Sequence, residues 1–250
     1  PAAKELGQGL GLVAKTINLA LKPFELTVWG FDQIEEYIKK KITQKLEKVE
    51  TDKIINPDPS IVGPSLDALR YLGNNEDLKE LFATLIANSM NIDKVSTVHP
   101  SYVDIIKNIT SDEAKLLVSL YLATAFPLVD IYFTKNDQEG EHVFNRNYSP
   151  VLKNSNIVGK DFLSTYIDNL CRLGLTEIPS GLQLVKKDIY DEIINYPEVK
   201  EFESGFIKGN SKIVLKKKLI RLTDYGSNFC RSCIDFENTP FGKVEVVVNK

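Results

Sequence analysis

Residues 61–117 decide the fold class of this chain, because helix signals stand at fixed places along them: IVGPSLDALRYLGNNEDLKELFATLIANSMNIDKVSTVHPSYVDIIKNITSDEAKLL. Pro64 suits the first turn of a short helix, and Gly73 suits the left-handed position that ends it. Asn75 can cap the next helix, in which apolar residues recur at helical spacing. The stretch therefore predicts two helices joined by a short turn. The residues expected on the buried face of the second helix are Leu78, Leu81, Phe82, Leu85, Ile86 and Met90.

Two further helices are predicted in the second half of the same stretch. His99 and Pro100 precede a short helix over residues 102–108. Thr110 and Glu113 stand in the T-x-x-E relation of a capping box, in which each side chain binds an amide that the first helical turn leaves without a partner. This pair predicts the start of a helix that runs to Ala125.

The N-terminal part is also predicted to be helical. Apolar residues at helical spacing indicate a helix over residues 6–21, which Pro23 ends. A longer helix over residues 31–49 carries a narrow apolar stripe among many charged residues. The stripe favours packing within the domain, and self-association through the same helix is the alternative.

The character of the sequence changes near Phe126. Residues 129–133 indicate a strand or a buried helix end, and the polar residues 136–147 indicate a loop. Asp161 can cap a helix that ends at Gly174. A second domain is therefore expected in this half of the chain.

The C-terminal part adds strands to this pattern. Residues 182–185 indicate a short strand and residues 212–222 a longer one, while Thr223 can cap a last helix. Residues 244–248 indicate a terminal strand. The order of helices, hairpin and final helix is that of a winged-helix domain with an insertion near residues 187–205.

The expected fold class is mainly α. A helical domain over residues 1–109 precedes a winged-helix-like α+β domain over residues 110–250. The net charge of -3 argues against a protein that coats nucleic acid with a generally basic surface. Three cysteines are an odd number and fit a reducing compartment, so we expect a cytoplasmic protein. No segment has the roughly 18 consecutive apolar residues that a membrane-spanning helix needs.

With those residues in view, the chain is similar to a known family. The segments GPSLDALRYLG, EDLKELFATLIANSM and HPSYVDIIKNITSDEAKLL within residues 63–117 resemble the Abi-alpha (abortive infection alpha) family of bacterial proteins. This resemblance implies a role in phage resistance. It supplies no catalytic residue and no cofactor, so none is expected.

The candidates for chemistry each have a simpler structural interpretation. Cys230 and Cys233 form a C-x-x-C pair that could bind zinc or act in redox chemistry, but no partner spacing completes a ligand set, and packing in the core is preferred. His99 could be a general base, but it has no recognisable nucleophile beside it, and a turn-locking role is preferred. The carboxylates Glu76, Asp77, Glu80, Asp67 and Asp104 are expected mostly at the surface or at helix starts.

The basic stretch of residues 208–221 is the strongest candidate for nucleic-acid binding. It falls where the wing of a winged helix would lie and where such residues bind phosphates. The preceding helix carries acidic residues, so a solvated strand or a protein contact is the alternative. The residues expected to bind nucleic acid are Lys212, Lys216, Lys218 and Arg221.

The amphipathic N-terminal segment is a candidate for membrane contact, through Leu10, Val13 and Ile17. Burial of the same residues in a helical core is the alternative. No metal site is predicted. We expect a phage-defence protein that acts without catalysis, through protein or nucleic-acid contacts. The alternatives are an effector that binds membranes through the N-terminal helix and a DNA-binding winged-helix regulator.

Overall fold

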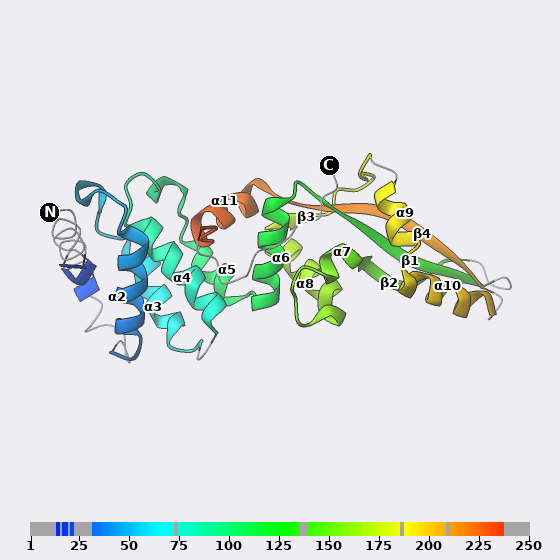
Figure 1. Cartoon of the computed structure of the whole chain (residues 1–250), viewed down its shortest axis with the longest axis horizontal. Helices are drawn as coiled ribbons and strands as arrows, with labels where there is room; N and C mark the ends of the chain where they lie inside the picture. Colours follow the sequence, from blue (N-terminus) through cyan, green and yellow to red (C-terminus); the bar gives the residue numbers. More distant parts are fainter. Residues whose placement is uncertain are drawn as a thin grey trace. The chain divides into compact units, whose positions relative to one another are not determined.

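The protein is mainly helical, with a four-stranded antiparallel sheet in its C-terminal part (Figure 1). The computed structural model describes residues 14–15, 17–19, 21–22, 32–72, 75–135, 140–185, 188–208 and 211–237. The chain divides into two compact units. Of the described residues, those up to 111 together with 228–237 form the first unit, and residues 112–227 form the second.

The first unit is built from short helices around a core of aliphatic side chains. Its central helix is α4, in which every residue that the sequence placed on the buried face is at most 6% exposed. The side chain of Asn75 accepts a hydrogen bond from the backbone N–H of Leu78 at 3.2 Å, which confirms the predicted cap. The described helices of this unit are α2 (Asp32–Leu46), η1 (Thr51–Lys53), α3 (Pro59–Leu69), α4 (Glu76–Ser89), η2 (Val95–Thr97), α5 (Ser101–Lys107) and residues 228–233 of α11 (Asp224–Cys233).

Helix α3 begins earlier than the sequence suggested. Asp58 accepts a hydrogen bond from the N–H of Ser60 at 2.8 Å, and Pro59 occupies the first helical turn. Pro64 therefore lies inside the helix and not at its start, so its prediction was wrong. Both prolines suit a helix start, and only the first has an aspartate in the capping position. Gly73, the predicted end of this helix, lies outside the described residues.

The second unit combines helices with the sheet. Its elements are α6 (Ser111–Leu122), β1 (Phe126–Lys135), β2 (His142–Tyr148), α7 (Pro150–Lys153), η3 (Lys160–Phe162), α8 (Leu163–Arg172), β3 (Thr176–Glu177), α9 (Asp188–Ile194), α10 (Pro197–Lys208) and β4 (Ser211–Leu222). The strands are ordered β2-β1-β4-β3, and each neighbouring pair is antiparallel. The predicted strand at residues 212–222 is confirmed as β4, and the alternative of a helix end at residues 129–133 is excluded because they lie within β1.

Three local predictions in this unit were wrong. Residues 142–147, assigned to a polar loop, lie in the edge strand β2, whose exposed side chains hide the usual alternation of strand residues. Residues 182–185 are not a strand. Asp161 lies in η3 and does not cap α8, which begins after Phe162 without a side-chain cap. Residues 244–248 lie outside the described residues.

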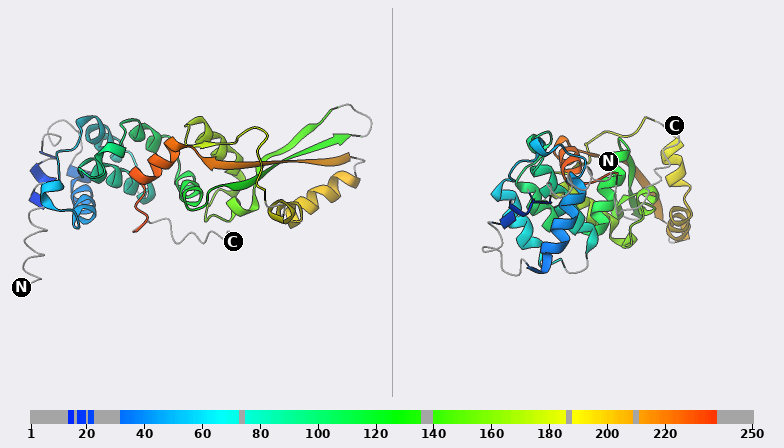
Figure 2. Two further views of the ribbon diagram at one scale, coloured as in Figure 1. Left: turned by 90° about the horizontal axis from the view of Figure 1, so that it is seen from above. Right: turned by 60° about the vertical axis from the view of Figure 1, so that its left-hand side comes forward.

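The two long strands β1 and β4 have different surroundings on their two faces. On one face, Val129 and Ile131 form a core with Tyr190 and Ile193 of α9 and Val199 of α10. Figure 2 shows α10 running beside these strands. The other face carries Asp130 paired in register with Lys216. By alternation along β4, Lys212, Lys216 and Lys218 therefore lie on the face away from α9 and α10, whereas Arg221 lies on the other face.

Thr223 marks the change from β4 to α11, as the sequence predicted. Its Oγ1 accepts a hydrogen bond from the N–H of Gly226 at 2.9 Å and donates to the carbonyl of Gly174 at 2.6 Å. A side chain at Gly226 would overlap the carbonyl of Leu175, so this close approach requires glycine. Gly174 has φ +73, the left-handed conformation expected at the end of α8.

Candidate functional site

Strand β4 carries all four predicted nucleic-acid residues, and three of them have acidic partners. Lys216 Nζ lies 2.5 Å from Glu141 Oε2, and Lys218 Nζ lies 2.6 Å from Asp130 Oδ1. Arg221 Nε lies 2.7 Å from Glu177 Oε1. Each of these cations is thus opposed by a carboxylate on a neighbouring strand or turn. A phosphate that approached them would compete with these carboxylates.

Lys212 differs from the other three basic residues. Its side chain is exposed, and among the described residues it forms no ion pair. The hydrogen bond from Lys216 to Glu141 raises the pKa of Lys216, so that lysine stays fully charged but locally neutralised. Of the predicted set, Lys212 therefore has the charge most available to a partner.

Lys218 belongs to a partly buried polar network. Asn147 has φ 55 and lies where the pairing of β1 and β2 shifts register, so β2 is bulged there. Its N–H donates to Asp130 Oδ1 at 2.9 Å, and its side-chain amide donates to Asp168 Oδ1 at 3.1 Å. Lys218 Nζ donates to Asn147 Oδ1 at 2.8 Å. This network joins the sheet to α8 and assigns Lys218 a structural role.

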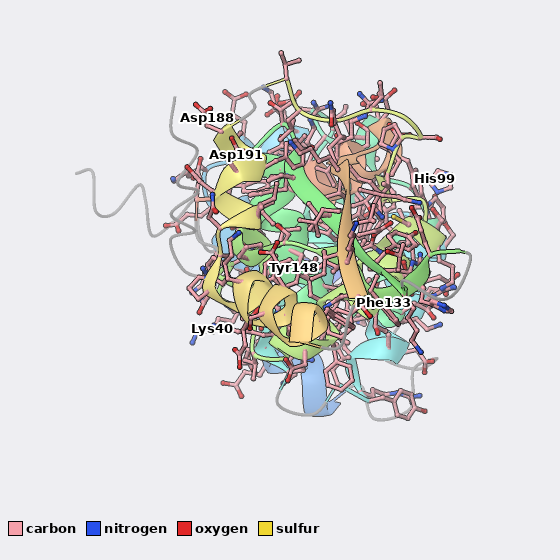
Figure 3. The ribbon with its side chains drawn as sticks, turned by 90° about the vertical axis from the view of Figure 1, so that its right-hand side faces the viewer. Lys40, His99, Phe133, Tyr148, Asp188 and Asp191 are labelled. Atoms are coloured by element: carbon pink, nitrogen blue, oxygen red, sulfur yellow. The ribbon has the colours of Figure 1, made fainter. Side chains whose placement is uncertain are left out.

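The end of β1, the start of β2 and helix α10 carry a group of aromatic side chains that was not predicted from the sequence. We call it the aromatic end, and it consists of Phe133, His142, Phe144, Phe202 and Phe206. Figure 3 looks toward this part of the sheet and labels Phe133. Phe144 is 41% exposed, which is unusual for a ring of this size. The sequence held one indication of this group, because Phe202 and Phe206 stand four residues apart in and beside the predicted insertion.

The predicted core role of the C-x-x-C pair agrees with the structure. Cys230 and Cys233 are both fully buried in the first unit, and burial raises the pKa of each thiol. A thiolate, the form needed for metal binding or redox attack, is therefore disfavoured. No group of three or more potential metal ligands occurs among the residues that the structure describes.

His99 makes local contacts that fit its predicted turn-locking role. Its Nδ1 accepts a hydrogen bond from the N–H of Ser101 at 3.2 Å and lies 2.6 Å from Ser101 Oγ. These contacts close the turn that precedes α5. The imidazole therefore acts on the backbone of its own turn.

Glu80 was wrongly expected at the surface. It is 6% exposed, and its carboxylate binds Lys41 Nζ at 2.8 Å and Lys45 Nζ at 2.5 Å. Lys45 also binds Asp235 Oδ2 at 2.8 Å, so one ammonium bridges two acids. We call Glu80, Lys41, Lys45 and Asp235 the ion cluster. Burial is the main cause that raises the pKa of the adjacent Tyr37, and the negative charge of Glu80 raises it further.

Most of the residues predicted for membrane contact or self-association are buried where the structure describes them. Leu10 and Val13 lie outside the described residues, and Ile17 is fully buried. Of the apolar stripe of α2, Ile38, Ile42 and Leu46 are buried, and α2 packs on α4. Within the described part of the chain, no helix has the length and apolar character to cross a membrane.

Comparisons with known proteins give a match to a solved structure and a match to a protein family. A solved structure of an uncharacterized protein from the hydrocarbon-degrading marine bacterium Alcanivorax borkumensis SK2 is 19% identical. It covers 56% of this chain and 94% of its own, but its TM-score of 0.36 carries no argument about fold or function. No curated protein matches the chain. The sequence model described as abortive infection alpha matches residues 30–233, and the chain therefore belongs to the abortive infection alpha family.

Proposed function

We propose that this protein acts in phage defence, by abortive infection, and that it does so through binding surfaces without catalysing a reaction. The observation that carries the proposal is membership of the abortive infection alpha family over residues 30–233. A family name gives a role and no mechanism, so the mode of action must come from the residues.

The non-enzymatic part of the proposal is supported by what the polar side chains do. The most buried carboxylate of α4, Glu80, neutralises two lysines, and Asp130 holds a bulged strand. His99 closes a turn, and Cys230 packs in the core. Carboxylates, histidines and cysteines are the usual catalytic groups of active sites, whereas each of these residues stabilises the local structure.

The winged-helix interpretation of the second unit is part of the proposal. The order α6, β1, α7, α8, β3, β4 and the strand neighbours β1-β4-β3 support it. In this interpretation β2 extends the first strand into a hairpin, and α9 and α10 replace a simple wing between β3 and β4.

The contacts and burial of the described residues favour some of the possible modes of action over others. Pairing of Lys216, Lys218 and Arg221 with carboxylates disfavours a DNA-binding regulator that uses all of β4. Burial of Ile17 favours core packing of the N-terminal segment over a membrane contact. Protein or nucleic-acid contacts at the exposed parts of the second unit are therefore preferred. A cytoplasmic location is also proposed, and the odd number of cysteines supports it.

Plaque counts test the defence role directly. Cells that carry the intact gene should form fewer plaques with at least one phage of a broad panel than cells that carry the gene with an early stop codon. Abortive infection also predicts that cultures survive a low phage dose but collapse at a dose that infects every cell. Equal plaque numbers for all phages would refute the proposal.

A further inference from the structure

Lys218, Asn147 and Asp130 meet on the face of the sheet that lies away from α9 and α10. Asp130 Oδ1 lies 2.6 Å from Lys218 Nζ and accepts a hydrogen bond from the backbone N–H of Asn147 at 2.9 Å. Lys218 Nζ is also 2.8 Å from Asn147 Oδ1. A primary amine, a side-chain amide and a carboxylate are therefore in mutual contact.

The three side chains are poorly solvated. Asn147 is 1% exposed, and the side chains of Asp130 and Lys218 are 10% and 22% exposed. Asn147 also has φ 55, a conformation that costs free energy for a residue other than glycine. An ion pair between Lys218 and Asp130 requires neither this conformation nor a buried amide. A reaction between the amine and the amide uses both.

We propose that Lys218 and Asn147 are joined by a spontaneous isopeptide bond. Asp130 accepts a proton from the ammonium of Lys218, across a contact short enough for direct transfer. Burial favours the resulting neutral pair, because two charges leave a poorly solvated site. The neutral amine then attacks Cγ of Asn147. Because the reactants are already held in contact, the attack needs no encounter between separate molecules.

The reaction balances with the loss of one ammonia. A bond forms between Nζ and Cγ, a proton moves from Nζ to Nδ2, and the bond between Cγ and Nδ2 breaks as the carbonyl forms again. Asp168 Oδ1 accepts a hydrogen bond from Asn147 Nδ2 at 3.1 Å, so its carboxylate stabilises the positive charge that this nitrogen gains before it leaves. The proton held by Asp130 passes to the released ammonia. The step needs no oxidant and no second reactant.

The bond links β4 to β2 across β1, because the strands are ordered β2-β1-β4. It is an amide, so it persists in a reducing compartment, where disulfides do not. The reaction occurs once in each chain and acts on no substrate. It therefore goes beyond the proposed function and does not depend on it.

Intact mass spectrometry of the denatured full chain tests the inference. The wild-type chain should be lighter than the mass calculated from its sequence by one ammonia, about 17 Da. After tryptic digestion, cleavage at Lys218 should be lost, and a branched peptide should join Lys218 to Asn147. Lys218→Met and Asn147→Gly should each have the full calculated mass. Glycine accepts the positive φ of this position while it removes the amide.

Two further variants separate the roles of the neighbouring charges. Lys216→Met is the matched control, because Lys216 lies on the same face of β4 but pairs with Glu141, and this variant should keep the loss of ammonia. Asp130→Asn should form the bond at least about a hundredfold more slowly, the usual loss when a positioned base is removed. Circular dichroism should show that the variants keep their helix content.

Each outcome decides the inference. A wild-type mass equal to the calculated mass overturns it. A loss of ammonia that persists in Lys218→Met also overturns it, because an asparagine can lose ammonia by closing a ring with its own backbone. Bond formation by Asp130→Asn at the wild-type rate would overturn the proposed step. The branched peptide of the wild-type protein decides the inference even where a variant fails to fold.

Discussion

Replacing Lys45 by Met should destabilise the first unit strongly. The ammonium of Lys45 lies 2.5 Å from Glu80 and 2.8 Å from Asp235, and its side chain is only 10% exposed. Met has a similar length and flexibility, so the change removes charge with little loss of packing. It leaves two carboxylates in a poorly solvated region, and Lys41 remains to neutralise only Glu80.

The expected magnitude follows from the burial of this ion cluster. Removal of one partner from a buried ion pair costs about 3–5 kcal/mol, and because the Lys41 contact remains, we expect Lys45→Met to lower the free energy of unfolding by about 3 kcal/mol. That loss corresponds to a melting temperature lower by about 10 °C for a unit of this size. Lys48→Met is the matched control in the same part of the chain. Lys48 and Glu237 are 88% and 79% exposed at 3.6 Å, so its loss should cost about 0–1 kcal/mol.

Urea denaturation combined with hydrogen exchange of the α2 and α4 amides measures the effect on the first unit. Glu80→Gln in the Lys45→Met background should recover part of the lost stability, because it removes a carboxylate that has lost one of its cations. If Lys45→Met is no more destabilising than Lys48→Met, the ion cluster does not stabilise the fold as argued.

Three further predictions concern other parts of the chain. Gly226→Ala should lower the free energy of unfolding, measured by urea denaturation, by several kcal/mol, because its new methyl group meets a backbone carbonyl. Gly205→Ala has open space on α10 and should raise the free energy of unfolding by up to about 1 kcal/mol. Equal effects of the two substitutions would contradict the close approach at Gly226. Although burial acts to raise the pKa of Asp112, the backbone N–H groups of two residues and a lysine lower it overall. A lowered folded-state pKa contributes stability above the unfolded value that is lost as the pH falls through the folded pKa. Stability should therefore fall below about pH 4, and Asp112→Asn should flatten this part of the curve; an unchanged slope would reject the assignment. Cys230 and Cys233 should react with a thiol reagent only at the rate of unfolding, because both are fully buried; rapid labelling of the native protein would refute their core role.

The helices of residues 75–122 could be predicted because their signals are local. Asn75 caps α4, and apolar side chains at helical spacing define the face that becomes buried. Thr223 was predicted as a cap from the same kind of signal. Where two equivalent local signals compete, as at Pro59 and Pro64, the sequence alone chose the wrong helix start.

The sheet was harder to predict because strand pairing joins distant residues. The long strand β4 was predicted at residues 212–222, but the edge strand β2 exposes most of its side chains and was assigned to a loop. The candidate site shows the same limit. Lys212, Lys216 and Lys218 were found in the sequence, whereas Glu141 and Asp130 became their partners or neighbours only through the sheet register.

The sequence by itself determined the helical class of the chain, the position of its basic strand and its family resemblance. These properties depend on residues within a few turns of one another, so spacing is enough to reveal them. Only the tertiary structure decided which charges remain available. Neutralisation depends on distances of a few ångströms between residues far apart in the chain, such as Lys45 and Asp235. The tertiary structure also decided that Phe133, His142 and Phe206 form one stack, because β1, β2 and α10 must pack together before those rings can meet.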